Sequence, residues 1–157
     1  MKYIWLVGIF LICYALRAEE HDEYWEERHC LAEAIYYEAR GEELEGKLAV
    51  AGVILERVNT TNFPNTICKV VHDGVYLNGV IVRNRCAFSY YCDGKGEPMK
   101  SEVAKKDAFY IADLALQGVI YTETEGATYY HASYVNPAWA EDFIFLGRVG
   151  YHLFYAE

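Results

Sequence analysis

Residues 30–42 read CLAEAIYYEARGE and decide how the chain around them folds. Three apolar residues recur at spacings of three and four, which places them on one face of a predicted helix. They are Leu31, Ala34 and Ile35. Glu38 is the next position on that face, and Gly41 predicts the end of the helix within a turn. A carboxyl group among apolar neighbours can stay protonated near neutral pH, so Glu38 is a candidate general acid. The alternative is a helix-end glutamate whose carboxylate reaches water.

Helical periodicity continues on the carboxyl side of this segment. Residues 42–58 form a second predicted helix that is apolar on every side in its middle, so we expect it at the centre of the domain. Thr66 is placed to cap a short helix that runs to Val71. Residues 101–117 form a third predicted helix, and Gly118 closes it.

The rest of the chain is strand-like and rich in turn signals. The pairs Asp73-Gly74 and Asn78-Gly79 predict tight turns. Strand-like segments follow at residues 80–82, 87–91, 127–132 and 139–156, with turns at Gly147 and Gly150. Helices first, then short strands with one more helix, indicate an α+β fold. A chain of 157 residues is long enough for one domain with a substantial core.

The amino terminus carries an export signal. Lys2 precedes residues 3–16, which contain no charged side chain. Such a run is short for a bilayer span and typical of a signal peptide, which predicts cleavage near Ala18. The organisation is then a signal peptide at 1–18 and a catalytic domain at 19–157. An uncleaved anchor, which would tether the protein to a membrane, is the alternative. Either way we expect a periplasmic, extracellular or cell-wall associated protein.

Four cysteines remain after the predicted cleavage: Cys30, Cys68, Cys86 and Cys92. An even number in an exported chain predicts disulfides. Cys86 and Cys92 flank a short loop, which favours the pairing Cys86–Cys92 and therefore Cys30–Cys68. Four reduced, buried cysteines are the alternative. No CxxC spacing supports a zinc site.

Charge and composition exclude several partners. The formal net charge is -9, which disfavours both nucleic acid and anionic lipid surfaces. The 15 tyrosines have apolar faces and polar tips that suit contacts with sugars, although a Tyr-rich core and rim would explain them equally. No histidine pair has the spacing of a metal site, and we expect neither metal nor cofactor.

The chemistry that fits best uses one carboxyl group. Cleavage of a glycosidic bond usually needs an acid and a second carboxylate. The candidates for that second group are Glu42, Glu45, Glu56 and Asp93. Glu42 could face the same cleft, but none of the four lies on an apolar face as Glu38 does. A lytic transglycosylase needs only one, since the 6-hydroxyl of the sugar closes the ring.

Aromatic segments supply candidates for the cleft wall. Phe88 and Ser89 lie in FSYY, and Tyr129 and His131 lie in TYYHA. Rings and hydroxyl groups in such segments can stack on and bind sugars. The alternative is ordinary strand alternation, with His131 as a hydrogen-bonding residue of the core or rim.

The chain resembles the catalytic domain of the SleB-type spore cortex-lytic enzymes, a family of cell wall hydrolases. The matching segments are residues 30–42, 45–58, 63–71, 86–94, 127–132 with 136–139, and 150–156. The resemblance implies a lysozyme-like or lytic transglycosylase-like domain with a helical lobe and a small β lobe. It also implies that Glu38 is the acid and base of a reaction that cuts peptidoglycan between N-acetylmuramic acid and N-acetylglucosamine, leaving a 1,6-anhydro end.

This chain departs from that family pattern in three respects. Glu56 replaces a commoner asparagine, and Tyr90 stands where tryptophan is frequent. We also expect no separate amino-terminal repeat for binding peptidoglycan, so that the catalytic domain finds substrate alone.

The predicted function is therefore glycan-strand cleavage by a monomer whose partner is peptidoglycan. Two alternatives belong to other classes. A zinc amidase of the stem peptide would need His131, His152 and a carboxylate to converge. A non-catalytic wall-binding protein would use the same aromatic groove with Glu38 idle.

Overall fold

The computed structural model describes residues 3–95 and 98–157, with side chains from residue 20 onward. The predicted signal or anchor, residues 1–18, therefore lies outside the part whose side chains are described. Within the described part of the chain, no helix is long and apolar enough to cross a membrane.

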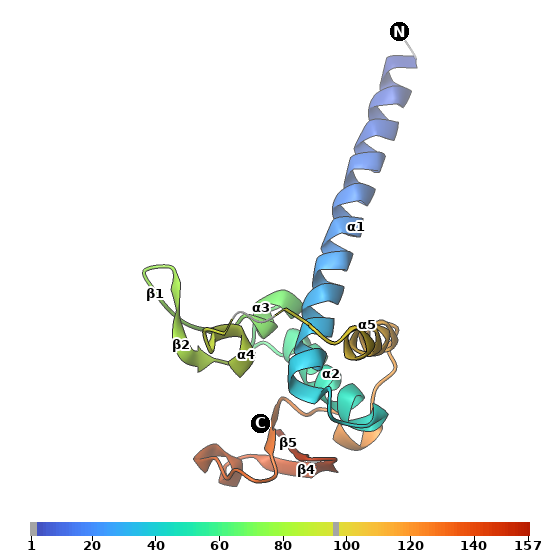
Figure 1. Ribbon diagram of the computed structural model, residues 1–157. Coiled ribbons are helices and arrows are strands. Elements are labelled where there is room, and N and C mark those ends of the chain that lie inside the picture. The colour runs from blue at the N-terminus through green and yellow to red at the C-terminus, as the bar shows by residue number, and fades with distance from the viewer. Residues whose placement is uncertain (1–2, 96–97) are drawn as a thin grey trace.

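Helix α1 (Tyr3–Ala39) is the element around which the others pack (Figure 1). Its carboxyl-terminal part contacts α2 (Leu44–Asn59), α3 (Ile67–Val71) and α5 (Glu102–Leu116). The predicted apolar stripe of α1 is fully buried there. The opposite end of α1 projects from the body of the molecule (Figure 1).

Helix α2 is buried on two sides, as its all-round apolar sequence predicts. Leu48, Ala51 and Ile54 join the main core with α1, α3 and α5. Val50 and Val53 join a second core. That second core lies against the sheet near the carboxyl terminus, where Phe154 is fully buried. The middle of α2 is therefore apolar all round because it separates the two cores.

A three-stranded antiparallel sheet closes the chain, in the order β3-β5-β4. Its strands are β3 (Tyr129–Ala132), β4 (Ile144–Val149) and β5 (His152–Ala156). Two short 3₁₀ helices precede β3 and β4, namely η1 (Thr122–Thr124) and η2 (Ala138–Glu141). Gly150 makes the β4–β5 turn with φ +55°. Gly147 is not a turn as predicted, because it lies inside β4 at a shift of register.

A separate hairpin joins β1 (Gly74–Leu77) to β2 (Val80–Cys86). Asn78 and Gly79 form its turn with φ of 52° and 79°, as the Asn-Gly signal predicts. The strand predicted at 87–91 is wrong, because the helical turn α4 (Ser89–Cys92) occupies most of it. The disulfide Cys86–Cys92 holds its Cα atoms 6.2 Å apart, whereas six extended residues span about 20 Å.

The second disulfide, Cys30–Cys68, fastens α1 to α3 across 38 residues. Both predicted pairings are therefore present. The fold is α+β, as predicted, and the helix that carries Glu38 is the most heavily packed element.

Candidate active site

Glu38 is the last residue but one of α1, and its carboxyl group faces a cleft. The hydroxyl of Tyr130, on β3, donates a hydrogen bond to Glu38 Oε2 at 3.1 Å. Burial raises the pKa of Glu38, and the Tyr130 bond opposes that rise to a smaller extent. Burial also raises the pKa of Tyr130, so its hydroxyl keeps the proton that it donates. The geometry holds a carboxyl group that stays protonated above the usual range of glutamate.

The cleft has a volume of about 650 Å³. One wall is the end of α1, and the other is α4 with the loop that follows it. The residues that line it are Glu33, Tyr37, Glu38, Arg40, Ser89, Tyr90, Tyr91, Asp93, Lys95 and Pro98. A volume of this size is within the range of clefts that bind ligands.

Charged groups of both signs line the same cleft as Glu38. The backbone N–H of Lys95 donates to Asp93 Oδ1 at 2.8 Å, and this bond lowers the pKa of Asp93. Asp93 therefore remains ionised under conditions in which Glu38 holds its proton. Two carboxyl groups with pKa values pushed in opposite directions mark a site able to divide acid and base roles.

Three tyrosines line the cleft, and two of them form a stacked pair. Tyr37 and Tyr90 stack with ring centroids 4.6 Å apart and planes 19° apart. The Tyr90 hydroxyl is buried and has no hydrogen-bond partner among the residues that the structure describes. Burial raises its pKa, with further contributions from Glu33 and Glu38. Flat rings at a polar cleft suit the apolar faces of sugars.

Glu42 does not line the cleft, although its spacing from Glu38 suggested that it could. It is 9% exposed and lies against the β4–β5 turn. Its Oε1 accepts from the Tyr151 N–H at 3.1 Å and lies 3.0 Å from His152 Nδ1. A Cβ at Gly150 would stand 1.7 Å from Glu42 Oε2, so a side chain at position 150 would require the Glu42 carboxylate to shift. We call Glu42, Gly150, Tyr151 and His152 the Glu42 junction.

Comparison with known proteins identifies the family of this chain. A family model described as Cell Wall Hydrolase matches residues 41–155. The chain belongs to the cell wall hydrolase family. The matched region begins after Glu38, so the match itself does not assign that residue.

Relatives within this family are bacterial cortex-lytic enzymes. The spore cortex-lytic enzyme of Bacillus subtilis strain 168 is 32% identical over 124 residues, which cover 79% of this chain and 35% of the relative. The corresponding enzyme of Halalkalibacterium halodurans is 32% identical over 79% of this chain and 33% of its own length. This chain therefore spans about a third of these relatives.

Solved structures give a fuller match. The catalytic domain of the germination-specific lytic transglycosylase SleB from Bacillus anthracis is 31% identical, with a TM-score of 0.60. The match covers 82% of this chain and 93% of that domain. The Bacillus cereus SleB catalytic domain is 28% identical with a TM-score of 0.57. The α+β architecture of this cell wall hydrolase is therefore the one predicted.

The predicted wall residues separate into two groups. Ser89 lines the cleft beside Glu38. Phe88 does not, because it is 2% exposed and packs in the main core. Tyr129 and His131 do not line the cleft either. Tyr129 packs against Trp139 and Phe143.

Strand alternation explains why Tyr129 and His131 miss the cleft. Successive side chains of β3 point to opposite faces of the sheet, so Tyr130 faces α1 while its two neighbours face away. His131 Nε2 instead lies 3.0 Å from the hydroxyl of Tyr155, within an aromatic cluster. Within the TYYHA segment it is therefore Tyr130 that contacts Glu38.

The same alternation separates the two histidines that an amidase would need to bring together. His131 lies against Tyr155, whereas His152 lies against Tyr130 and Phe154 on the other face of the sheet. Among the described side chains, which belong to residues 20–95 and 98–157, no three His, Cys, Asp or Glu are grouped so that they could hold a metal ion.

Proposed function

We propose that this cell wall hydrolase cuts the glycan strands of peptidoglycan by lytic transglycosylation. The bond cut is the one between N-acetylmuramic acid and N-acetylglucosamine. Glu38 is the general acid and then the general base. The observation that carries this proposal is the raised pKa of a carboxyl group at the wall of a 650 Å³ cleft.

The chemistry requires a single carboxyl group that changes role. Protonated Glu38 gives its proton to the bridging oxygen while the bond from that oxygen to muramic C1 breaks. Positive charge then develops at C1 and the ring oxygen. The Glu38 carboxylate next removes the proton from the 6-hydroxyl of the same sugar as its oxygen bonds to C1. The products are a 1,6-anhydro end and a free hydroxyl on the leaving strand, and Glu38 is protonated again.

The Tyr130 hydroxyl supports both halves of this cycle. It holds one oxygen of Glu38 in place at 3.1 Å, which leaves the other oxygen for the substrate. It also stabilises the carboxylate that forms after the first proton transfer, since a hydrogen bond to the charged form favours that form.

Peptidoglycan as the substrate is supported by the relatives and by the cleft. The relatives are called cortex-lytic enzymes, and the similar solved domain is called a lytic transglycosylase. The stacked rings of Tyr37 and Tyr90 offer a face for a sugar. Ser89 supplies a hydroxyl at the cleft wall.

A second candidate, hydrolysis by two carboxyl groups, is favoured by Asp93. Its lowered pKa keeps it ionised at the same cleft, where it could activate a water molecule. The two reactions leave different ends, because hydrolysis gives a reducing muramic end and transglycosylation gives an anhydro end.

Export is part of the proposal. Residues 1–18 would act as a signal peptide or as an anchor, and residues 19–157 would work as a monomer in the periplasm, outside the cell or at the cell wall. The amino-terminal sequence of the protein recovered from fractionated cells distinguishes cleavage from anchoring.

Digestion of purified sacculi tests the proposal. We expect Glu38→Gln to lower the release of soluble fragments by about 10²- to 10⁴-fold, because the amide has no proton to give. Glu45→Gln, at an exposed carboxylate on α2, is the matched control and should keep wild-type activity. Mass spectrometry of the wild-type products should show anhydro ends. Full activity in Glu38→Gln would refute the role of Glu38, and reducing ends would favour the Asp93 reaction.

A further inference from the structure

A second groove adjoins the cleft on the side of the β1–β2 hairpin. It has a volume of about 410 Å³ and is lined by Pro64, Cys68, Lys69, His72, Asp73, Tyr76 and Tyr91. Tyr91 lines both this groove and the cleft that contains Glu38. The two hollows are therefore neighbours across a single side chain.

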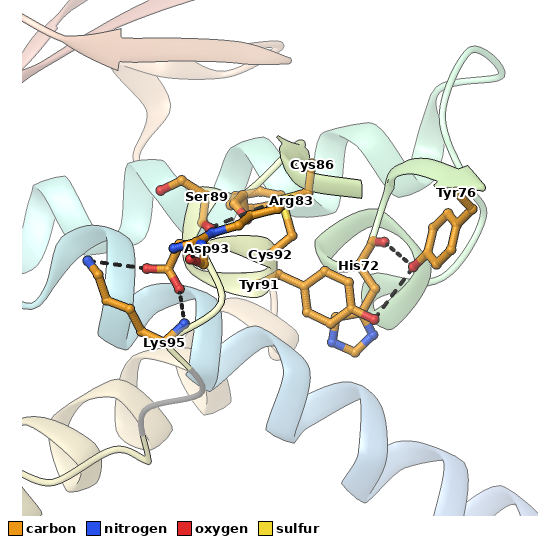
Figure 2. Close-up of a disulfide and its surroundings, with 10 residues drawn as sticks. His72, Tyr76, Arg83, Cys86, Ser89, Tyr91, Cys92, Asp93 and Lys95 are labelled. Atoms are coloured by element: carbon orange, nitrogen blue, oxygen red, sulfur yellow. Dashed lines mark hydrogen bonds and ion pairs between the residues drawn. A yellow bond between two sulfur atoms is a disulfide. The ribbon is translucent and has the colours of Figure 1, made fainter. Parts of the chain in front are cut away.

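Three aromatic side chains form the wall of this groove (Figure 2). The rings of His72 and Tyr91 stack with centroids 4.2 Å apart and planes 18° apart. The Tyr76 hydroxyl donates to the backbone oxygen of His72 at 3.0 Å and lies 3.5 Å from the Tyr91 hydroxyl. Tyr76 nevertheless stays 48% exposed, so part of its ring remains open to a ligand.

The hairpin that carries Tyr76 is fixed to the wall of the cleft. The disulfide Cys86–Cys92 joins the end of β2 to α4, whose Ser89 and Tyr90 line the cleft (Figure 2). Arg83 Nε, on β2, donates to the backbone oxygen of Asp93 at 2.9 Å. A surface held at these points keeps its position relative to Glu38, which lowers the entropy cost of binding.

A polymer cut at Glu38 must continue beyond the cleft, and this groove lies on a path that it can take. We infer that the groove between Tyr76, His72 and Tyr91 is a further subsite for the glycan strand, in which the Tyr76 ring stacks on a sugar. The inference rests on the proposed function for the identity of the strand.

Binding to glycan strands freed of their stem peptides tests this subsite without requiring turnover. In a Glu38→Gln background, we expect Tyr76→Ala to weaken binding by roughly threefold to tenfold, the range for loss of one ring contact. Leu77→Ala is the matched control, since Leu77 is 68% exposed on the same strand and does not line the groove. It should bind as the background protein does.

Tyr76→Phe separates the ring contact from the support of the hairpin. It removes the bond to His72 but keeps the ring, and we expect binding within about twofold of the background protein. Unchanged binding in Tyr76→Ala would overturn the inference. Equal losses in Tyr76→Ala and Tyr76→Phe, or in Tyr76→Ala and Leu77→Ala, would also overturn it. So would a loss seen only on strands that retain stem peptides.

The proposed function can fail separately. Wild-type protein that releases no fragments from sacculi, while binding to glycan still depends on Tyr76, would refute the enzyme and keep the subsite. If the wild-type protein cleaves sacculi but Tyr76→Ala does not change binding to glycan, the subsite is refuted and the enzyme activity stands.

Discussion

The cleft around Glu38 and the Glu42 junction each contain a glutamate that is at least partly buried, but the surroundings of the two carboxyl groups differ. The two glutamates are one helical turn apart in sequence. Glu38 is partly buried at the cleft with a single hydroxyl donor, and burial raises its pKa. Glu42 is buried against a turn, where a backbone N–H and an imidazole meet its carboxylate. The two carboxyl groups therefore differ in the groups that they meet, which is why we propose proton transfer for Glu38 and a structural role for Glu42.

The two glutamates meet different surroundings because α1 ends between them. Residues four apart on a helix share a face, which is why Glu42 could be expected at the cleft. However, α1 ends at Ala39, and the Glu42 N–H bonds the backbone oxygen of Ala39 at 2.9 Å as the chain turns. Glu42 therefore leaves the face of Glu38 and meets the β4–β5 turn.

The largest effect that we expect comes from breaking the junction at Gly150. Gly150→Ala should lower the free energy of unfolding by about 3 kcal/mol or more. The added Cβ would clash with Glu42, and alanine would have to adopt the left-handed backbone conformation of Gly150. Gly79→Ala is the control, because φ is +79° there but an added Cβ would meet nothing within 4 Å. This variant should lower the free energy of unfolding by only about 1 kcal/mol. Urea denaturation measures both. An equal loss of unfolding free energy in the two variants would mean that the Glu42 junction is loosely packed.

Exchange of the two carboxylates for amides should give crossed effects. Glu42→Gln should lower the free energy of unfolding by about 1–3 kcal/mol, because the amide leaves a buried polar group unmatched. The folded fraction should keep most of its activity on sacculi. Glu38→Gln should lose activity and keep its stability. A folded Glu42→Gln protein as inactive as Glu38→Gln would place Glu42 in the chemistry and remove the contrast.

The smallest effect should come from Tyr130→Phe. It is measured in the dependence of kcat/KM on pH. The Tyr130 bond stabilises the Glu38 carboxylate, so its loss should raise the pKa of Glu38 further. Because the first step needs protonated Glu38, activity falls as pH rises through that pKa. The falling limb of kcat/KM should therefore move to higher pH. Stability should change by only about 0.5–1.5 kcal/mol.

Tyr129→Phe is the matched control for this profile, since Tyr129 points to the other face of β3. Its falling limb should stay where the wild-type limb lies. A limb that moves to lower pH in Tyr130→Phe would show that the hydroxyl favours the protonated form of Glu38 instead.

Local structure was largely predictable because its causes are local. Thr66 caps α3 by accepting from the Lys69 N–H at 3.3 Å, and Ser101 caps α5 in the same way through Ala104. The Asn78-Gly79 turn follows from the backbone freedom of those two residues. Each of these features depends on residues within four positions of one another.

The errors share a different cause. The strand predicted at 87–91 is displaced by a disulfide that draws its two ends together. The sequence predicts Tyr129 and His131 for the cleft wall, whereas Tyr130 contacts Glu38, because a strand shows which residues alternate but not which face meets the core. Phe88 packs in the core, a position that its FSYY context does not reveal.

The sequence by itself determined that Glu38 ends an apolar stripe, that α2 is central, and that four cysteines form two pairs. Only the tertiary structure decided which partners reach each glutamate. Tyr130 meets Glu38 across 92 residues of chain, and Tyr151 meets Glu42 across 109. Periodicity reports the face on which a side chain lies, whereas such contacts depend on how α1 and the sheet pack, which the whole core decides.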